Sequence, residues 1–145
     1  MKNRKRGFSL VELLIVLAVI AALIATITPV ALNAIKKAKA TQVGQNVKTL
    51  ASAFENALYV NGTEPTFAEL GRDINAAKYN VAYTTSSGVY TVAVLTSEEV
   101  NYETLQGVLR DISEGSYTTT GLTQLNGTSY TGTTQFYYEF TFEVY

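Results

Sequence analysis

The order of hydrophobic and polar residues divides the chain into three parts. Residues 8–25 are 18 consecutive positions in which Glu12 carries the only charge, and a weaker apolar character continues to Leu32. An apolar run of this length is enough for a helix that spans a membrane. We therefore expect residues 8–32 to form such a helix.

Residues 33–60 change from uniformly apolar to amphipathic. Their apolar residues recur every three or four positions and predict one buried stripe of a helix: Val43, Val47, Leu50, Ala51, Phe54 and Leu58. A single helix from about Phe8 to Tyr59 would be roughly 75–80 Å long. Gly44 is expected to soften it, and Asn61-Gly62 to end it.

Residues 61–145 predict a head of short helices and strands. The pattern from Thr66 to Glu69 is typical of a helix capping box, with Phe67, Leu70 and Ile74 at helical spacing. Residues 79–85 and 89–95 predict a β-hairpin around residues 86–88. A second capping-box pattern begins at Thr96 and predicts a helix whose buried face holds Val100, Leu105, Val108, Leu109 and Ile112.

Three further strands are predicted over residues 116–120, 128–134 and 135–145, which are rich in threonine and tyrosine. The last strand alternates most clearly. One face carries Phe136, Tyr138, Phe140, Phe142 and Val144, which we expect to pack on the helix stripe. The expected fold class is α+β, in which a long N-terminal helix packs against a small antiparallel sheet.

Composition excludes several kinds of chemistry. The 145 residues include no cysteine and no histidine, so disulfides, Cys-based metal sites and Ser-His or Cys-His nucleophiles are absent. We therefore expect no enzyme. Residues 61–145 carry three basic and ten acidic side chains, a balance of −7 that argues against general nucleic-acid binding.

The first seven residues carry four bases and no acid: Lys2, Arg4, Lys5 and Arg6. Bases in this position hold their end of a membrane helix in the cytoplasm, so the rest of the chain would face outward. The apolar run could be a secretory signal that is removed, or a plain anchor. A plain anchor leaves Glu12 unexplained, because a carboxylate inside an apolar span is costly and usually marks function.

A third interpretation accounts for Glu12. The basic leader ending in Gly7, followed by Phe8-Ser9-Leu10-Val11-Glu12 and a long apolar helix, resembles the signature of type IV pilins and the pseudopilins of related secretion and DNA-uptake machines. The resemblance implies that a membrane peptidase cuts between Gly7 and Phe8 and methylates the new amine of Phe8. It also implies that Glu12 neutralises the amino terminus of a neighbouring subunit during assembly.

Pro29 matches a proline that commonly kinks the helix in this family. Many members also have a glycine earlier in the helix, whereas this chain has Val19-Ile20-Ala21-Ala22-Leu23. The expected organisation is a removed leader at 1–7, a membrane and filament-core helix at 8–32, its amphipathic continuation at 33–60 and a head at 61–145.

The leading hypothesis from this resemblance is a structural subunit of a type IV pilus or pilus-like filament. The precursor would sit in the cytoplasmic (inner) membrane as a single-pass protein with its head outside, and later form an extracellular or periplasmic filament. Its expected partners are other copies of itself, the prepilin peptidase and methyltransferase, the assembly platform with its ATPase, and the membrane.

Two alternatives stay open at this point. One is a minor pilin, or a pseudopilin of a type II secretion or DNA-uptake machine, acting in adhesion, secretion or uptake. The other is a signal-anchored enzyme or solute-binding domain. Observing long filaments dominated by this subunit would favour the leading hypothesis over both.

No cofactor is expected in the head. Its acidic residues are interpreted as solvated helix faces in preference to a calcium site: Glu98, Glu99 and Glu103, or Asp111 with Glu114. Asn61-Gly62-Thr63 and Asn126-Gly127-Thr128 match the glycosylation pattern, and we interpret both as turns. The tyrosines beyond residue 60 are expected to serve as core and cross-strand residues and not as a binding surface.

Overall fold

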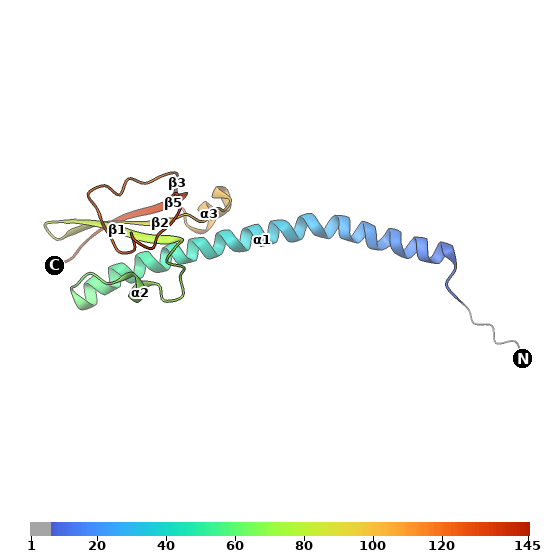
Figure 1. Cartoon of the computed structure of the whole chain (residues 1–145), viewed down its shortest axis with the longest axis horizontal. Coiled ribbons are helices and arrows are strands. Elements are labelled where there is room, and N and C mark those ends of the chain that lie inside the picture. Colours follow the sequence, from blue (N-terminus) through green and yellow to red (C-terminus); the bar gives the residue numbers. More distant parts are fainter. Residues whose placement is uncertain (1–6) are drawn as a thin grey trace, which may run out of the picture. The chain divides into compact units, whose positions relative to one another are not determined.

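The computed structural model describes residues 7–145, and the predicted leader therefore lies outside the described residues except for Gly7. The chain divides into two compact units, one that ends at Lys36 and one that comprises Lys37–Tyr145. Helix α1, Leu10–Asn61, contributes to both units (Figure 1). The predicted long helix is confirmed, with its start two residues later and its end two residues later than expected.

Helix α1 ends at Asn61, and Gly62 caps its C-terminal end. The Gly62 amide donates a hydrogen bond of 3.0 Å to the carbonyl of Leu58, and Gly62 has a φ of +68°. A left-handed conformation after the last helical residue is easily adopted only by glycine. The prediction that Asn61-Gly62 ends the helix is therefore confirmed.

The apolar stripe of α1 in the second unit is buried as predicted. All six predicted residues lie in the core, and Phe54, Leu50 and Val47 have no exposed surface. Ala40 and Gly44 are also buried. A Cβ atom added at Gly44 would lie 2.8 Å from Cγ1 of Val108, so this glycine allows close approach of helix α3 (Tyr102–Val108) to an unbroken α1.

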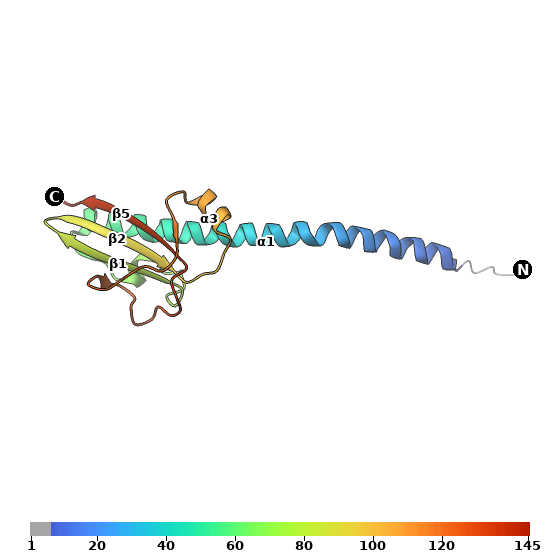
Figure 2. The ribbon, with the colours of Figure 1, turned by 90° about the horizontal axis from the view of Figure 1, so that it is seen from above.

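A five-stranded antiparallel sheet covers this stripe (Figure 2). Its strands are β1 (Tyr79–Ser86), β2 (Val89–Thr96), β3 (Ser113–Glu114), β4 (Thr123–Gln124) and β5 (Phe136–Glu143), in the order β3-β5-β2-β1-β4. The predicted β1–β2 hairpin is confirmed, with positive φ at Ser87 and Gly88 as a tight two-residue turn requires. The expected α+β class is thereby shown.

The two faces of the sheet bury different sets of residues. On the α1 side, Phe54 lies with its ring centroid 5.2 Å from that of Tyr83 and 6.4 Å from that of Phe142. The face of β5 that was predicted to pack on the stripe does so, through Phe136, Tyr138, Phe140, Phe142 and Val144. On the opposite side, Ala82, Ala93 and Leu95 are covered by Tyr117, Leu122, Tyr130 and Tyr137. The second face is therefore covered at its centre, whereas Thr84, Glu139 and Thr141 remain exposed.

The first predicted capping box is confirmed and the second is wrong. In helix α2 (Phe67–Leu70), Oε2 of Glu69 accepts hydrogen bonds from the amide and the hydroxyl of Thr66. Ile74 lies beyond this single turn but still packs on the core.

The second box fails because Thr96 is the last residue of β2 and pairs with Phe136 of β5. Helix α3 is capped instead by Asn101, whose Oδ1 accepts from the amide of Thr104 at 2.9 Å. Of the five predicted face residues, Leu105 is buried within α3, and Leu109 and Ile112 are buried beyond its end. Val100 precedes the helix, and Val108 is 41% exposed.

The strands predicted at 116–120 and 128–134 are also wrong, because both segments are irregular. The backbone of the second segment bonds to another part of the head, since the amide of Thr131 donates to the carbonyl of Ala77. The strand preference of threonine and tyrosine depends on a neighbouring strand, and here the tyrosines instead cover the sheet face.

Candidate functional site: the start of helix α1

Gly7 and Phe8 lie immediately before helix α1 and outside any regular element. Phe8 is 83% exposed, and no heavy atom lies within 4 Å of a Cβ placed on Gly7. The peptide bond between them therefore lies in an irregular, exposed stretch of chain.

Glu12 lies in the first turn of α1 and forms a reciprocal cap with Ser9. The Ser9 amide donates to Oε2 of Glu12 at 3.2 Å, and the Glu12 amide donates to Oγ of Ser9 at 3.2 Å. This is the capping-box arrangement, which satisfies two backbone donors that a helix start leaves free. Sequence reasoning overlooked it, although Ser9-x-x-Glu12 was there to be recognised.

The described part of the first unit has no buried core. Its large apolar side chains from Leu10 to Ile35 are at least 46% exposed, and no residue of α1 before Ala40 is buried. Within the described residues, α1 is the one helix long and apolar enough to cross a membrane. Exposure of so much apolar surface is unfavourable in water and indicates an apolar environment or partner.

Pro29 lies inside α1, and the helix is continuous through it. Proline has no amide hydrogen, so the carbonyl of Ala25 loses its usual donor. Two nearby hydroxyls bond back to the helix backbone: that of Thr26 donates to the Leu23 carbonyl at 2.9 Å, and that of Thr28 to the Ile24 carbonyl at 2.8 Å. Such back-bonding often bends helices, so the kink at Pro29 stays a prediction with added support.

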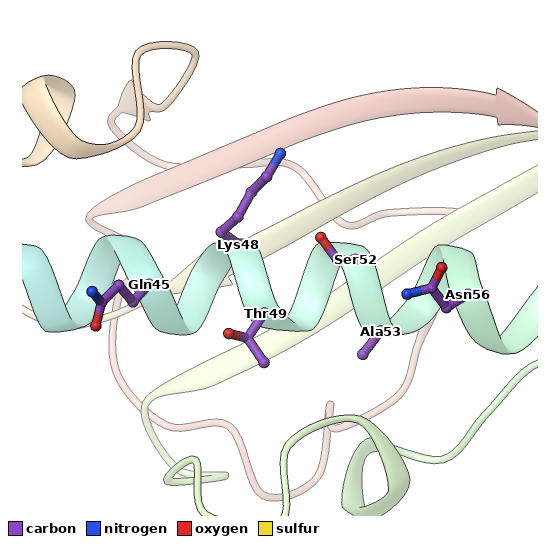
Figure 3. Close-up of a pocket in the computed structure, with 6 residues that line it drawn as sticks. All are labelled: Gln45, Lys48, Thr49, Ser52, Ala53 and Asn56. Carbon is purple, nitrogen blue, oxygen red and sulfur yellow. The ribbon is translucent and has the colours of Figure 1, made fainter.

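One hollow of the head lies along helix α1 and is lined mainly by polar side chains. Figure 3 shows this hollow of about 590 Å³ along the outward side of α1, lined by Gln45, Lys48, Thr49, Ser52, Ala53 and Asn56. It contains neither an acid nor a nucleophile paired with a base. This lining suits contact with water or a partner surface and gives no support to the enzyme alternative.

The acidic residues considered for calcium do not gather. Within residues 7–145, no group of three or more acidic side chains is placed to hold a metal ion. Glu98 instead forms an ion pair of 3.6 Å with Lys39. The absence of a cofactor in the head stays an expectation.

The structure separates the two Asn-Gly-Thr segments. Asn61 is the exposed last residue of α1. Asn126 is buried, and its side-chain amide donates to the carbonyls of Ala76 and Tyr79 while its backbone amide donates to Oδ1 of Asn80. Asn126 is thus a structural residue that holds the 115–134 segment on the sheet.

Most head tyrosines are structural as well. Tyr79 and Tyr83 are buried on the α1 side, whereas Tyr117 packs on Tyr137 and donates a hydrogen bond to Glu139 on the other side. Burial, followed by this hydrogen bond and the charge of Glu139, raises the pKa of Tyr117 to about 12. These contacts agree with the core and cross-strand role predicted for the tyrosines.

Comparison with known proteins gives one finding, and it falls on the candidate site. Residues 2–28 match the model of the prokaryotic N-terminal methylation motif. No curated protein and no solved structure matches the chain. The matched segment includes Gly7, Phe8 and Glu12 and ends one residue before Pro29. The chain thus carries at its N-terminus the prokaryotic methylation motif, which is the signal sequence of type IV pilins and pseudopilins.

Proposed function

We propose that this protein is a structural subunit of a type IV pilus or pilus-like filament, stored in the membrane and assembled through the first part of α1. The observation that carries the proposal is the methylation motif on a helix whose apolar residues 10–35 are exposed on every side. A helix that is hydrophobic all round needs lipid or other helices about it. Stored precursor and assembled filament provide these two environments in turn.

The proposed steps are assigned to individual residues. A prepilin peptidase cuts between Gly7 and Phe8, and the new amine of Phe8 is methylated. Glu12 then pairs with the amine of a neighbouring subunit inside the helical bundle. A charge in such a bundle is tolerable only when it is paired, which explains why this position bears a carboxylate.

The cap formed by Ser9 and Glu12 complicates the obvious test. Glu12→Ala removes the charge together with the hydrogen bond that Glu12 accepts from the Ser9 amide, whereas the amide of residue 12 can still donate to Oγ of Ser9. Loss of such a capping contact costs about 1 kcal/mol or less. Glu12→Gln is the matched variant, because glutamine also serves in a capping box but carries no charge. Comparing the two separates the assembly contact from helix stability.

Under the pairing mechanism both variants enter the membrane normally and fail to assemble. Removing one member of a buried ion pair costs about 3–5 kcal/mol, so filament yield falls by more than about tenfold in each. Sheared filaments are quantified against the membrane-bound pool. Normal filaments from Glu12→Gln would refute the pairing role and leave only the cap.

A further inference from the structure

A hollow at the membrane-proximal end of the head has an unusual distribution of charge. It measures about 440 Å³ and is lined by Lys37 and Thr41 of α1 and by Glu103, Thr104, Gly107 and Val108 of α3. The two helices lie side by side, as the contact between Gly44 and Val108 also shows (Figure 2). The space equals that of about fifteen water molecules.

The polar atoms of this hollow are one cation and several acceptors. The hydroxyl of Thr41 donates to the carbonyl of Lys37 at 2.8 Å, and that of Thr104 donates to Oδ1 of Asn101 at 3.1 Å. Both hydroxyl hydrogens are therefore engaged, and the two oxygens offer only lone pairs. Glu103 adds a carboxylate that forms no ion pair within residues 7–145. A ligand here needs an anionic part for Lys37 and N–H donors for the acceptors.

The position along α1 indicates where such a ligand would come from. Lys37 lies two residues after Ile35, where the apolar stretch ends. At about 1.5 Å per residue the stretch from residue 10 to 35 is about 39 Å long. A bilayer including its headgroups is about 40–45 Å thick, so a helix inserted over this stretch places Lys37 at the level of the outer headgroups.

We propose that this hollow binds the headgroup of a phosphatidylethanolamine molecule of the outer leaflet. The phosphate pairs with the Lys37 ammonium, and the lipid's own ammonium donates to Glu103 and to the hydroxyl oxygens of Thr41 and Thr104. Exposed Val108 offers an apolar contact at the rim. The inference rests on the membrane storage proposed above, and it gives the head a specific lipid contact before assembly.

The test compares two lipids that differ only at the amine. Phosphatidylcholine has the same charges and phosphate but no N–H donor. The full chain, purified in detergent, is mixed with equal amounts of the two lipids with identical acyl chains, and retained lipid is counted by native mass spectrometry. Because a hydrogen bond to a charged group is worth about one tenfold step in affinity, we expect about tenfold more ethanolamine lipid.

Each variant tests the contact with one part of the headgroup. Glu103→Gln removes the charge of the acceptor, so it lowers ethanolamine-lipid retention about tenfold and choline-lipid retention less, because choline has the positive charge but no N–H donor. Lys37→Gln lowers both equally because both have the phosphate. Gly107→Leu fills the hollow, since nothing lies within 4 Å of a Cβ there, and abolishes the preference without removing a charge. Glu99→Gln, an exposed acid outside the hollow, is the control with no effect.

Three outcomes would overturn the inference. Equal retention of the two lipids by the unaltered chain refutes it, as does an ethanolamine preference that Glu103→Gln does not reduce. If Gly107→Leu instead reduces filament yield while no lipid preference exists, the hollow is covered by a second copy of the chain. Extraction of the unaltered protein from membranes at alkaline pH would contradict membrane storage itself. A protein that stays in the membrane at alkaline pH but shows no lipid preference refutes the headgroup inference alone.

Discussion

Both halves of α1 carry many apolar residues, yet only those of the second half are buried. Residues 10–35 have apolar side chains in every direction, and all of them are exposed. Between Ala40 and Leu58 the apolar residues keep to one stripe, and that stripe has a sheet to cover it. The difference teaches that hydrophobicity alone does not predict burial in this chain: the spacing of apolar residues tells which half folds with the head and which half needs lipid or neighbouring helices.

The largest difference in stability is expected between two substitutions, one in each half of α1. Phe54→Ala removes a fully buried ring from the α1 stripe and should lower the free energy of unfolding of the head by about 3–5 kcal/mol. Ile20→Ala, in the exposed half, should leave head stability unchanged within about 0.5 kcal/mol. Urea unfolding of the full chain in mild detergent, followed by tyrosine fluorescence, measures both. Equal losses from the two variants would contradict the division of the helix.

A smaller effect is expected on the far side of the sheet. Asn126→Ala leaves the carbonyls of Ala76 and Tyr79 without their side-chain donor and should cost about 1–3 kcal/mol. Amide hydrogen exchange should rise in residues 115–134 and in β1, while residues 10–35 stay as in the unaltered chain. Asn61→Ala, at the other Asn-Gly-Thr segment, is the control with little effect. Faster exchange in the first half of α1 would show that its helix depends on the head.

The smallest effect is a dependence on alkaline pH confined to the head. The pKa of Tyr117 is raised from its ordinary value of 10.0 to about 12, so the folded head holds this proton more tightly than the unfolded chain. Its contribution is fully present below pH 10 and is lost as pH rises toward 12. After allowance for partial exposure we expect a loss of about 1 kcal/mol.

Tyr117→Phe tests this contribution because it keeps the ring and removes the titrating hydroxyl. Unfolding free energies at pH 9 and 11.5 should then differ less than in the unaltered chain. The other head tyrosines with raised pKa, among them Tyr79 and Tyr83, supply the remaining dependence in both proteins. An unchanged pH dependence in the variant would remove Tyr117 as a contributor.

The sequence allowed prediction of the elements whose residues follow a strict period or a local motif. Residues close together in the sequence determine three such elements: the stripe from Val43 to Leu58, the hairpin around Gly88 and the alternating final strand. The helix at Thr96 was mispredicted because its cap pattern competed with pairing to Phe136, a residue far along the chain. The role of Asn126 was also beyond local reasoning, since its partners lie 46 or more residues away.

The signals of the candidate site are contiguous in the sequence, unlike those of the head. Gly7, Phe8 and Glu12 fall within a single motif that a family comparison also matches. The cap formed by Ser9 and Glu12 was not predicted from the sequence, because Glu12 was considered as a charge and not as a hydrogen-bond acceptor. Roles that depend on a neighbouring subunit or on an enzyme involve atoms outside this chain, and its sequence and fold therefore leave them as proposals.

The central claim is that the apolar half of α1 is kept while the leader is removed. Intact mass spectrometry of the protein recovered from its native membrane or filaments, with sequencing of the N-terminal peptide, tests it most directly. The account predicts a chain that begins at a methylated Phe8 and retains the whole apolar stretch. A chain that begins beyond residue 25, as after cleavage of a secretory signal, would contradict it.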